Sequence, residues 1–268
     1  MNNTTTSTKT SKPLSTFFIL IFILSLPFYI GGSVVPEEMA LVFSLLITFV
    51  PVIAALILTY REKGSNGAKA LLKRSFDFKI ITKKIWYLPI FFLMPIVYLL
   101  VLWILRLIGE TLTETPVPIG AAPILLLVFF IMALGEEVGW MGYAFDPMEE
   151  RWKAFKASLI LGIIHAAWHI PIYIFVMKQP PLWMVGQLLV LAGLRILQVL
   201  IYKNTGKSLF AAILFHAVYN VPTMALPVYG SPLGPVITAV FVLLIVGIVA
   251  KLWDHETMTQ YKMKEEVA

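Results

Sequence analysis

The chain has 268 residues, of which 59% are hydrophobic and 13% are charged. Soluble domains carry about 25% charged residues, so this composition excludes an ordinary soluble protein and indicates an integral membrane protein with one helical bundle. The net charge of +6 needs no nucleic-acid partner, because the basic residues gather between apolar runs, and the lack of cysteine excludes disulfides, thiolate metal ligands and a cysteine nucleophile.

The chain begins with a polar tail, residues 1–13, that we predict to be disordered. Eight apolar runs follow, and most approach the ~20 residues that cross a bilayer. The predicted spans are Leu14–Ile30, Met39–Tyr60, Trp86–Ile108, Pro123–Ala144, Ala157–Met177, Pro181–Tyr202, Leu209–Ala225 and Gly234–Trp253. The first run resembles a signal peptide, but no small-residue cleavage site follows it, so we favour an uncleaved span. The sequence therefore predicts an all-α, polytopic membrane helical bundle of about eight transmembrane helices.

Basic residues predict how this bundle lies in the cell membrane. They concentrate in the N-terminal tail, in the segment 61–84, after the fourth and sixth spans and in the C-terminal tail, whereas the alternate connections hold only Arg106 and Lys178. The positive-inside rule then places both termini in the cytoplasm. We predict that 61–84 is a basic cytoplasmic loop, with an amphipathic piece on the anionic inner leaflet as the alternative.

Two adjacent acidic residues, Glu136 and Glu137, lie inside an apolar run, and no other run contains an acidic residue. A charged side chain at the centre of a membrane helix costs roughly 3 kcal/mol, so such residues are candidates for function. Neighbouring helical positions differ by about 100°, so we expect the two carboxylates to point to different places, one working and one structural. The alternative is that the pair only clamps two helices together.

Three histidines and an asparagine also lie in apolar runs. His165 and His169 are four residues apart, as are His216 and Asn220, so each pair shares a helix face. At about 1.5 Å per residue, Glu136, His169 and Asn220 each lie about 20 Å from the cytoplasmic surface. Three spans thus bring polar groups to one layer, although any single histidine here could simply hydrogen-bond a neighbouring helix.

Missing motifs narrow the chemistry of such a site. The chain has no HExxH sequence, no G-x-S-G serine setting and no aspartate inside a span. A carboxylate and an imidazole can take a proton from water and deliver it to a leaving amine, while a second histidine and an amide donate hydrogen bonds to an oxyanion. Two histidines and a glutamate could instead bind zinc. We predict a hydrolytic site without a cofactor, and we rank zinc second.

Three short motifs lie in the fourth, fifth and seventh predicted spans. They are Glu136-Glu137-Val138-Gly139-Trp140-Met141, Trp168-His169-Ile170-Pro171 and His216-Ala217-Val218-Tyr219-Asn220. In order and spacing they resemble the EExxxR, WHxP and HxxxN motifs of the CPBP family, the CAAX proteases and bacteriocin-processing proteins also called Abi. The resemblance covers roughly residues 123 to 225 and implies a multi-pass glutamic intramembrane endopeptidase. We therefore divide the chain into the tail 1–13, N-terminal spans 14–122, a catalytic core 123–225 and a last span with a cytoplasmic tail, 226–268.

The resemblance also implies roles for individual residues. By position, Glu136 and His169 would activate water, His216 and Asn220 would hold the oxyanion, and the second glutamate would support them. His169 fits the Trp-His-x-Pro form without gaps, whereas His165 follows an apolar residue at the position that the FxxxH form gives to phenylalanine. We therefore expect His169 to be the working histidine and His165 a supporting residue. The implied substrate is a peptide or protein that enters from the membrane or the cytoplasmic side, with the lipid bilayer as the other partner.

The sequence departs from the family motif at one position, where Met141 stands in place of arginine. An ionised Glu137 then needs another cation, because an uncompensated buried charge is destabilising. Arg106 and Lys251 lie at the ends of their predicted spans, so the other cation well inside a span is Arg195, which either reaches the glutamates or extends to the interface. The alternative function is a catalytically degenerate immunity or peptide-binding protein. A proton-coupled transporter is a third hypothesis, but no inverted repeat supports it.

Overall fold

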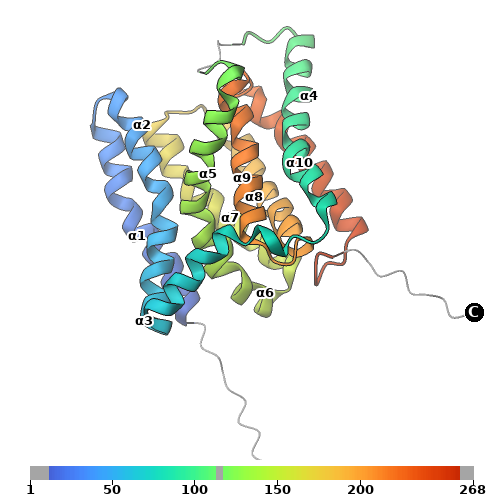
Figure 1. Cartoon of the computed structure of the whole chain (residues 1–268). Helices are drawn as coiled ribbons and strands as arrows, with labels where there is room; N and C mark the ends of the chain where they lie inside the picture. Colours follow the sequence, from blue (N-terminus) through green and yellow to red (C-terminus); the bar gives the residue numbers. More distant parts are fainter. Residues whose placement is uncertain (1–11, 113–116, 260–268) are drawn as a thin grey trace, which may run out of the picture.

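The computed structural model describes residues 12–112 and 117–259, and all regular elements in these ranges are helices (Figure 1). This confirms the all-α fold class. Residues 1–11 of the predicted disordered tail lie outside the described residues. Helix α1 begins at Lys12, two residues before the start of the predicted span.

The helices follow one another as rods that run up and down the bundle (Figure 1). The described chain starts and ends at the same end of the bundle, near α6, as an even number of crossings requires. In chain order the elements are α1 (Lys12–Val34), α2 (Glu37–Leu46), η1 (Ile47–Phe49), α3 (Val50–Lys73), η2 (Arg74–Phe76), η3 (Phe78–Ile80), η4 (Lys84–Trp86), η5 (Pro89–Leu93), α4 (Met94–Leu107), η6 (Ile119–Ala121), α5 (Ala122–Gly139), η7 (Trp140–Phe145), α6 (Asp146–Trp152), α7 (Ala154–Pro171), η8 (Ile172–Val176), α8 (Pro181–Asn204), α9 (Leu209–Ala225) and α10 (Leu233–Leu252).

Six helical stretches among the described residues are long and apolar enough to cross a membrane, which makes the chain a multi-pass membrane protein. They are Leu14–Val34, Lys84–Leu107, Ile119–Trp152, Ala154–Val176, Pro181–Asn204 and Leu233–Leu252. The helix Leu209–Ala225 is apolar but shorter, and it has the bounds that the sequence predicted. The predicted span Met39–Tyr60 is formed by α2, η1 and α3 together and is not among the six.

The segment 61–84 differs from the predicted loop, because much of it is helical. α3 passes Gly64, which has a φ of 67° and a ψ of −167°, and then continues as a second helical arm to Lys73. Glycine tolerates this left-handed backbone at little steric cost, so the helix can turn sharply and resume. Three short 3₁₀ turns, η2, η3 and η4, complete the segment.

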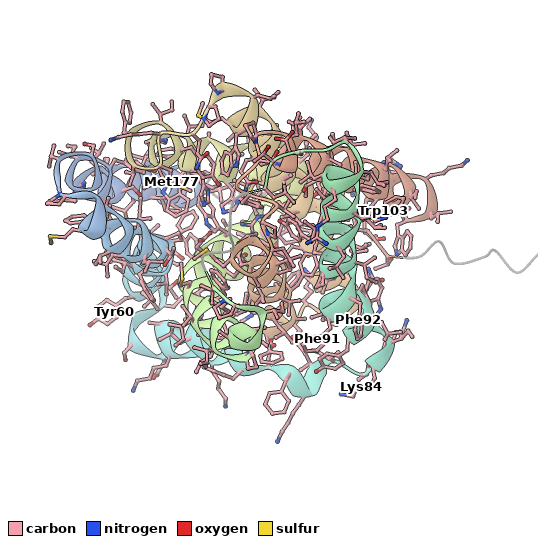
Figure 2. All side chains as sticks on the ribbon, turned by 90° about the horizontal axis from the view of Figure 1, so that it is seen from above. Tyr60, Lys84, Phe91, Phe92, Trp103 and Met177 are labelled. Carbon is pink, nitrogen blue, oxygen red and sulfur yellow. The ribbon has the colours of Figure 1, made fainter. Side chains whose placement is uncertain are left out.

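The most enclosed of the six candidate spans is α8, which carries Arg195. Its apolar window is 72% buried inside the bundle, against 17–39% for the other five candidate spans. α8 packs against α7, α9 and α10, and α5 packs against α3 and α9. Large apolar side chains such as Phe91, Phe92 and Trp103 project from the outside of the bundle (Figure 2), as a lipid-facing surface requires.

Candidate active site

Helix α5 brings the two glutamates deep into the bundle because small residues let it approach η1 and the start of α3. A Cβ on Gly135 would lie 2.7 Å from the Thr48 carbonyl oxygen, and one on Gly139 would lie 2.5 Å from that of Pro51. Only glycine fits such close backbone approach. After Gly139 the helix widens into the π-helix η7, Trp140–Phe145. Such π segments are frequent at functional sites.

Glu137 is fully buried and has two partners from other helices. Arg195 on α8 donates from Nη1 to Oε2 at 2.5 Å, and His216 on α9 donates from Nδ1 to Oε1 at 2.7 Å. Arg195 Nη1 also donates to Oε1 of Gln198 at 2.6 Å, and the Gln198 amide donates to the Ala212 carbonyl of α9 at 3.0 Å. Arg195 therefore reaches the glutamate layer and does not extend to the interface, which decides between the two expectations for this residue.

Glu136 pairs with α7. Its Oε2 shares a hydrogen bond of 3.0 Å with Nε2 of His165. His169 lies one turn further along, and its Nδ1 donates to the His165 carbonyl oxygen at 3.0 Å. A neutral ring with its proton on Nδ1 has a free lone pair on Nε2, so His169 is oriented to accept a proton. Ligand atoms of Glu136, His165 and His169 lie within 4.8 Å of one another, so both histidines of α7 are at the carboxylate.

The two glutamates are not separated as we expected. Ligand atoms of Glu136, Glu137 and His216 also lie within 4.8 Å of one another. The expectation of different directions was wrong because it considered only the Cα–Cβ vectors, whereas a glutamate side chain has enough rotatable bonds to bring its carboxylate back toward its neighbour's. The buried groups thus form one continuous cluster, in which His216 hydrogen-bonds Glu137 and lies within 4.8 Å of Glu136 by their ligand atoms.

Asn220 is less closely engaged. It is half-buried one turn beyond His216 on α9, and its backbone carbonyl accepts a hydrogen bond from the Thr223 hydroxyl at 2.7 Å. Its side-chain amide makes no hydrogen bond to another described residue. The structure therefore brings together Glu136, Glu137, His165, His169, His216 and Arg195 by direct contacts, and leaves the Asn220 amide without a protein partner.

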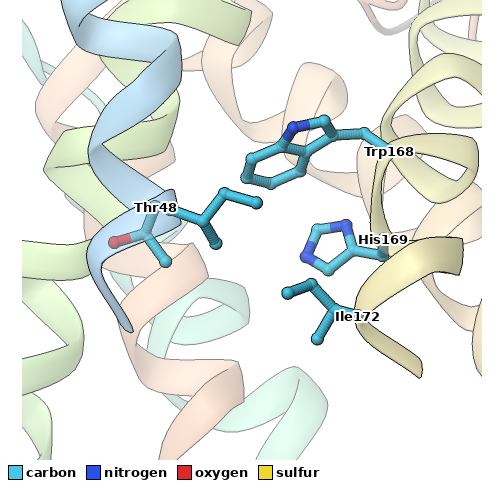
Figure 3. Close-up of a pocket in the computed structure, with 5 residues that line it drawn as sticks. Thr48, Trp168, His169 and Ile172 are labelled. Atoms are coloured by element: carbon cyan, nitrogen blue, oxygen red, sulfur yellow. The ribbon is translucent and has the colours of Figure 1, made fainter. Parts of the chain in front are cut away.

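An apolar cavity of about 40 Å³ borders His169. Ile47 and Thr48 form one side, and Trp168, His169 and Ile172 form the other (Figure 3). A space of this size can hold water. The imidazole ring is its one titratable group, so water here would lie against His169.

Helix α1 holds the tryptophan that precedes His169, a relationship the sequence did not suggest. The Trp168 indole donates to the Ser25 hydroxyl at 2.7 Å, and the Tyr29 hydroxyl donates to the Trp168 carbonyl oxygen at 2.6 Å. Trp140 packs edge-on against both Trp168 and His165, with ring centroids 5.7 Å and 5.4 Å apart. The signal available in the sequence was a serine and a tyrosine four residues apart on one face of an apolar span.

The N-terminal end of α9 is fixed by a carboxylate that lies outside the predicted spans. Asp77, between η2 and η3, accepts hydrogen bonds from the Ser208 hydroxyl at 2.7 Å and from the backbone amides of Leu209 and Phe210 at 3.3 and 3.1 Å. These amides have no partner within the helix, so Asp77 acts as a cap. It thereby fixes the start of the helix that carries His216.

The nitrogen and oxygen atoms of this cluster are also close enough together to bind a metal ion. Two histidine nitrogens and a carboxylate oxygen within 4.8 Å form a ligand set of the kind that holds zinc. Hydrogen bonding of His169 Nδ1 to a carbonyl is also the orientation that metal-binding histidines commonly show. Catalysis without a cofactor therefore stays a prediction for this site.

Comparisons with known proteins point to one class. Residues 118–222 match the family model of the type II CAAX prenyl endopeptidases described as Rce1-like. The chain is also 28% identical over 221 residues to CAAX prenyl protease 2 of Methanococcus maripaludis, an alignment that covers 77% of this chain and 80% of that protein. The family match includes both glutamates, all three intramembrane histidines, Arg195 and Asn220.

Proposed function

Because this chain belongs to the family of CAAX proteases and bacteriocin-processing proteins, we propose that it is an intramembrane endopeptidase that cleaves CAAX-type prenylated peptides. The observation that carries the proposal is the buried cluster in which Glu136 meets His165 and His169 while Glu137 meets His216 and Arg195. Ionisable groups in the interior of a membrane bundle are costly, so a function explains their presence better than packing does.

The first step activates water. A water between Glu136 and His169 loses a proton to this pair as its oxygen attacks the carbonyl carbon of the scissile bond. The carbonyl oxygen becomes an oxyanion and accepts hydrogen bonds from the Asn220 amide and from His216, whose ring in this proposal carries a proton on Nε2 as well as the Nδ1 proton that Glu137 accepts. The free amide of Asn220 and its position one turn from His216 support this role.

The second step releases the product. The intermediate collapses, the carbon–nitrogen bond breaks, and the leaving amine takes the proton that the Glu136–His169 pair had accepted. Glu137 takes no part in proton transfer. Its hydrogen bond fixes the His216 ring, and Arg195 balances its charge.

The orientation of the bundle belongs to the proposal as well. The acidic and basic cluster of Asp146, Glu149, Lys203 and Lys207 lies at the end of the bundle where the described chain begins and ends (Figure 1). We place that end, and both termini, in the cytoplasm because basic residues concentrate there.

The test uses the full chain purified in detergent and two peptides of one sequence, with and without a farnesyl group on the CAAX cysteine. Mass spectrometry measures release of the C-terminal tripeptide. We expect cleavage of the farnesylated peptide and its loss in Glu136→Gln. Release that persists unchanged in this variant would overturn the proposed mechanism.

The second candidate is a catalytically inactive peptide-binding protein of the same family. It is favoured by Met141, which is fully buried and apolar where the family motif has arginine. Binding of the farnesylated peptide without release of any fragment, by wild type and Glu136→Gln alike, would support this alternative over the protease.

A further inference from the structure

The elbow of α3 forms an apolar groove of about 430 Å³, and no histidine lines it. The last turns of the first arm and the start of the second arm line it, because the chain turns back at Gly64. The lining residues are Leu56, Ile57, Tyr60, Arg61, Ala68, Lys69 and Leu72. Tyr60 is 61% exposed and points outward from α3 (Figure 2).

Two cations at this groove lack acidic partners. Among the residues that the structure describes, neither Arg61 nor Lys69 makes an ion pair. The adjacent Glu62 forms no ion pair with either cation, and its Oε1 instead accepts a hydrogen bond from the Tyr143 hydroxyl at 2.7 Å. Some cations of this end are paired, as Lys207 is with Asp146 at 2.9 Å, whereas Lys63, Lys79 and Lys83 are, like the two groove cations, in no ion pair among the described residues.

The lining of the groove also straddles the end of a predicted span. Leu56 and Ile57 belong to the apolar run that ends at Tyr60, and the charged residues begin at Arg61. Tyrosine is enriched at this depth, and basic residues beside a membrane attract anionic lipids. An occupant must therefore carry an apolar chain on one side and a negative charge on the other.

We propose that this groove binds one anionic phospholipid of the leaflet at the basic end. The phosphate lies between the guanidinium of Arg61 and the ammonium of Lys69, and an acyl chain runs along Leu56, Ile57 and Tyr60. Guanidinium and ammonium groups both bind phosphate oxygens well. A second copy of the chain fits less well, since it would need to bring its own acidic side chains to this depth. The lipid site goes beyond the protease function and does not depend on it.

The experiment uses the full chain, delipidated in an uncharged detergent and titrated with dioleoyl phosphatidylglycerol or dioleoyl phosphatidylcholine. Native mass spectrometry counts the bound lipids. The test variant is Arg61→Gln/Lys69→Gln. The control, Lys79→Gln/Lys83→Gln, removes the same charge from exposed positions of the same basic segment outside the groove.

We expect the first phosphatidylglycerol to bind at least about tenfold more tightly than phosphatidylcholine, a preference that the groove variant loses and the control keeps. Equal binding of the two lipids by the wild type would overturn the proposal. So would an equal loss in the control, which would mean a diffuse attraction to the whole basic segment. Displacement of phosphatidylglycerol by a farnesylated peptide would also overturn it and assign the groove to substrate.

Discussion

Arg195 on α8 and Glu137 on α5 form a hydrogen-bonded ion pair of 2.5 Å in which both side chains are at most 1% exposed. Met141, on the turn after the glutamates, cannot provide a charge, so the cation comes from another helix. This pair also joins the most enclosed of the six candidate spans to the helix that carries both carboxylates. It explains how Glu137 can remain ionised although position 141 has no arginine.

Removing one member of this pair should destabilise the protein strongly. Breaking a buried ion pair costs roughly 3–5 kcal/mol, because the remaining charge is uncompensated. We expect Arg195→Gln to lower the thermal unfolding midpoint in detergent markedly, and Glu137→Gln/Arg195→Gln to recover much of the loss. The matched control is Arg106→Gln, an exposed cation in the last turn of α4. Simple additivity of the two single substitutions would contradict a direct Arg195–Glu137 coupling.

Glu136 should be indispensable for cleavage but not for folding. Glu136→Gln keeps the shape and one hydrogen-bonding oxygen while removing the basic carboxylate, so we expect peptide release to fall by about 10²–10⁴. Membrane insertion and the amount of purified protein should stay unchanged. Glu150→Gln, at an exposed position of α6, serves as the control. Activity of Glu136→Gln near the wild-type rate is the result that this mechanism does not allow.

The helical fold was largely predictable from the sequence, because apolar runs of membrane length have few alternatives to a helix. Leu209–Ala225 even has the predicted bounds. The continuation of α3 beyond Gly64 was not predictable from charge alone, because a basic segment can be a loop or an interfacial helix. The π-helices at Trp140–Phe145 and Ile172–Val176 also escaped prediction, since local widening of a helix depends on its packing partners.

The members of the site were predictable, but several of their contacts were not. Helix rise placed the polar residues of three spans in one layer, and motif order singled out Glu136 and His169. Periodicity does not determine which side chain rotates toward which neighbour, so the approach of the two glutamates appeared only in the structure. The choice of Arg195 between the glutamates and the interface likewise depended on the burial of α8 in the bundle.

The two histidines of α7 should differ in importance. His169 borders the cavity that can hold water, whereas His165 orients Glu136 through a hydrogen bond of 3.0 Å. We expect His169→Gln to reduce kcat by about 10²–10⁴. His165→Phe, which removes a hydrogen bond to a charged group, should reduce it only by about 10–100-fold. Steady-state kinetics with a farnesylated peptide measures both, and a larger loss in His165→Phe would exchange the two roles.

Cleavage should not require zinc, although Glu136, His165 and His169 could bind it. We expect no change in rate after prolonged treatment with a chelator, and no stoichiometric metal by elemental analysis of the active protein. Loss of activity on chelation, restored by zinc alone, would replace the water-activating glutamate with a metal-bound water. Glu136→Gln would then be expected to lower metal content as well as rate.

Asp77 should stabilise the protein through α9 although it lies outside the spans. Its carboxylate accepts from Ser208 and from two backbone amides at the start of that helix. Loss of such a cap typically costs about 0.5–2 kcal/mol, so Asp77→Ala should lower the thermal midpoint, and Asp77→Asn should retain part of the effect. Asp254→Ala is the control, because Asp254 also accepts backbone hydrogen bonds, from Glu256 and Thr257, but in a turn beyond α10. If Asp77→Ala unfolds at no lower temperature than Asp254→Ala, the Asp77 carboxylate does not stabilise the helix that carries His216.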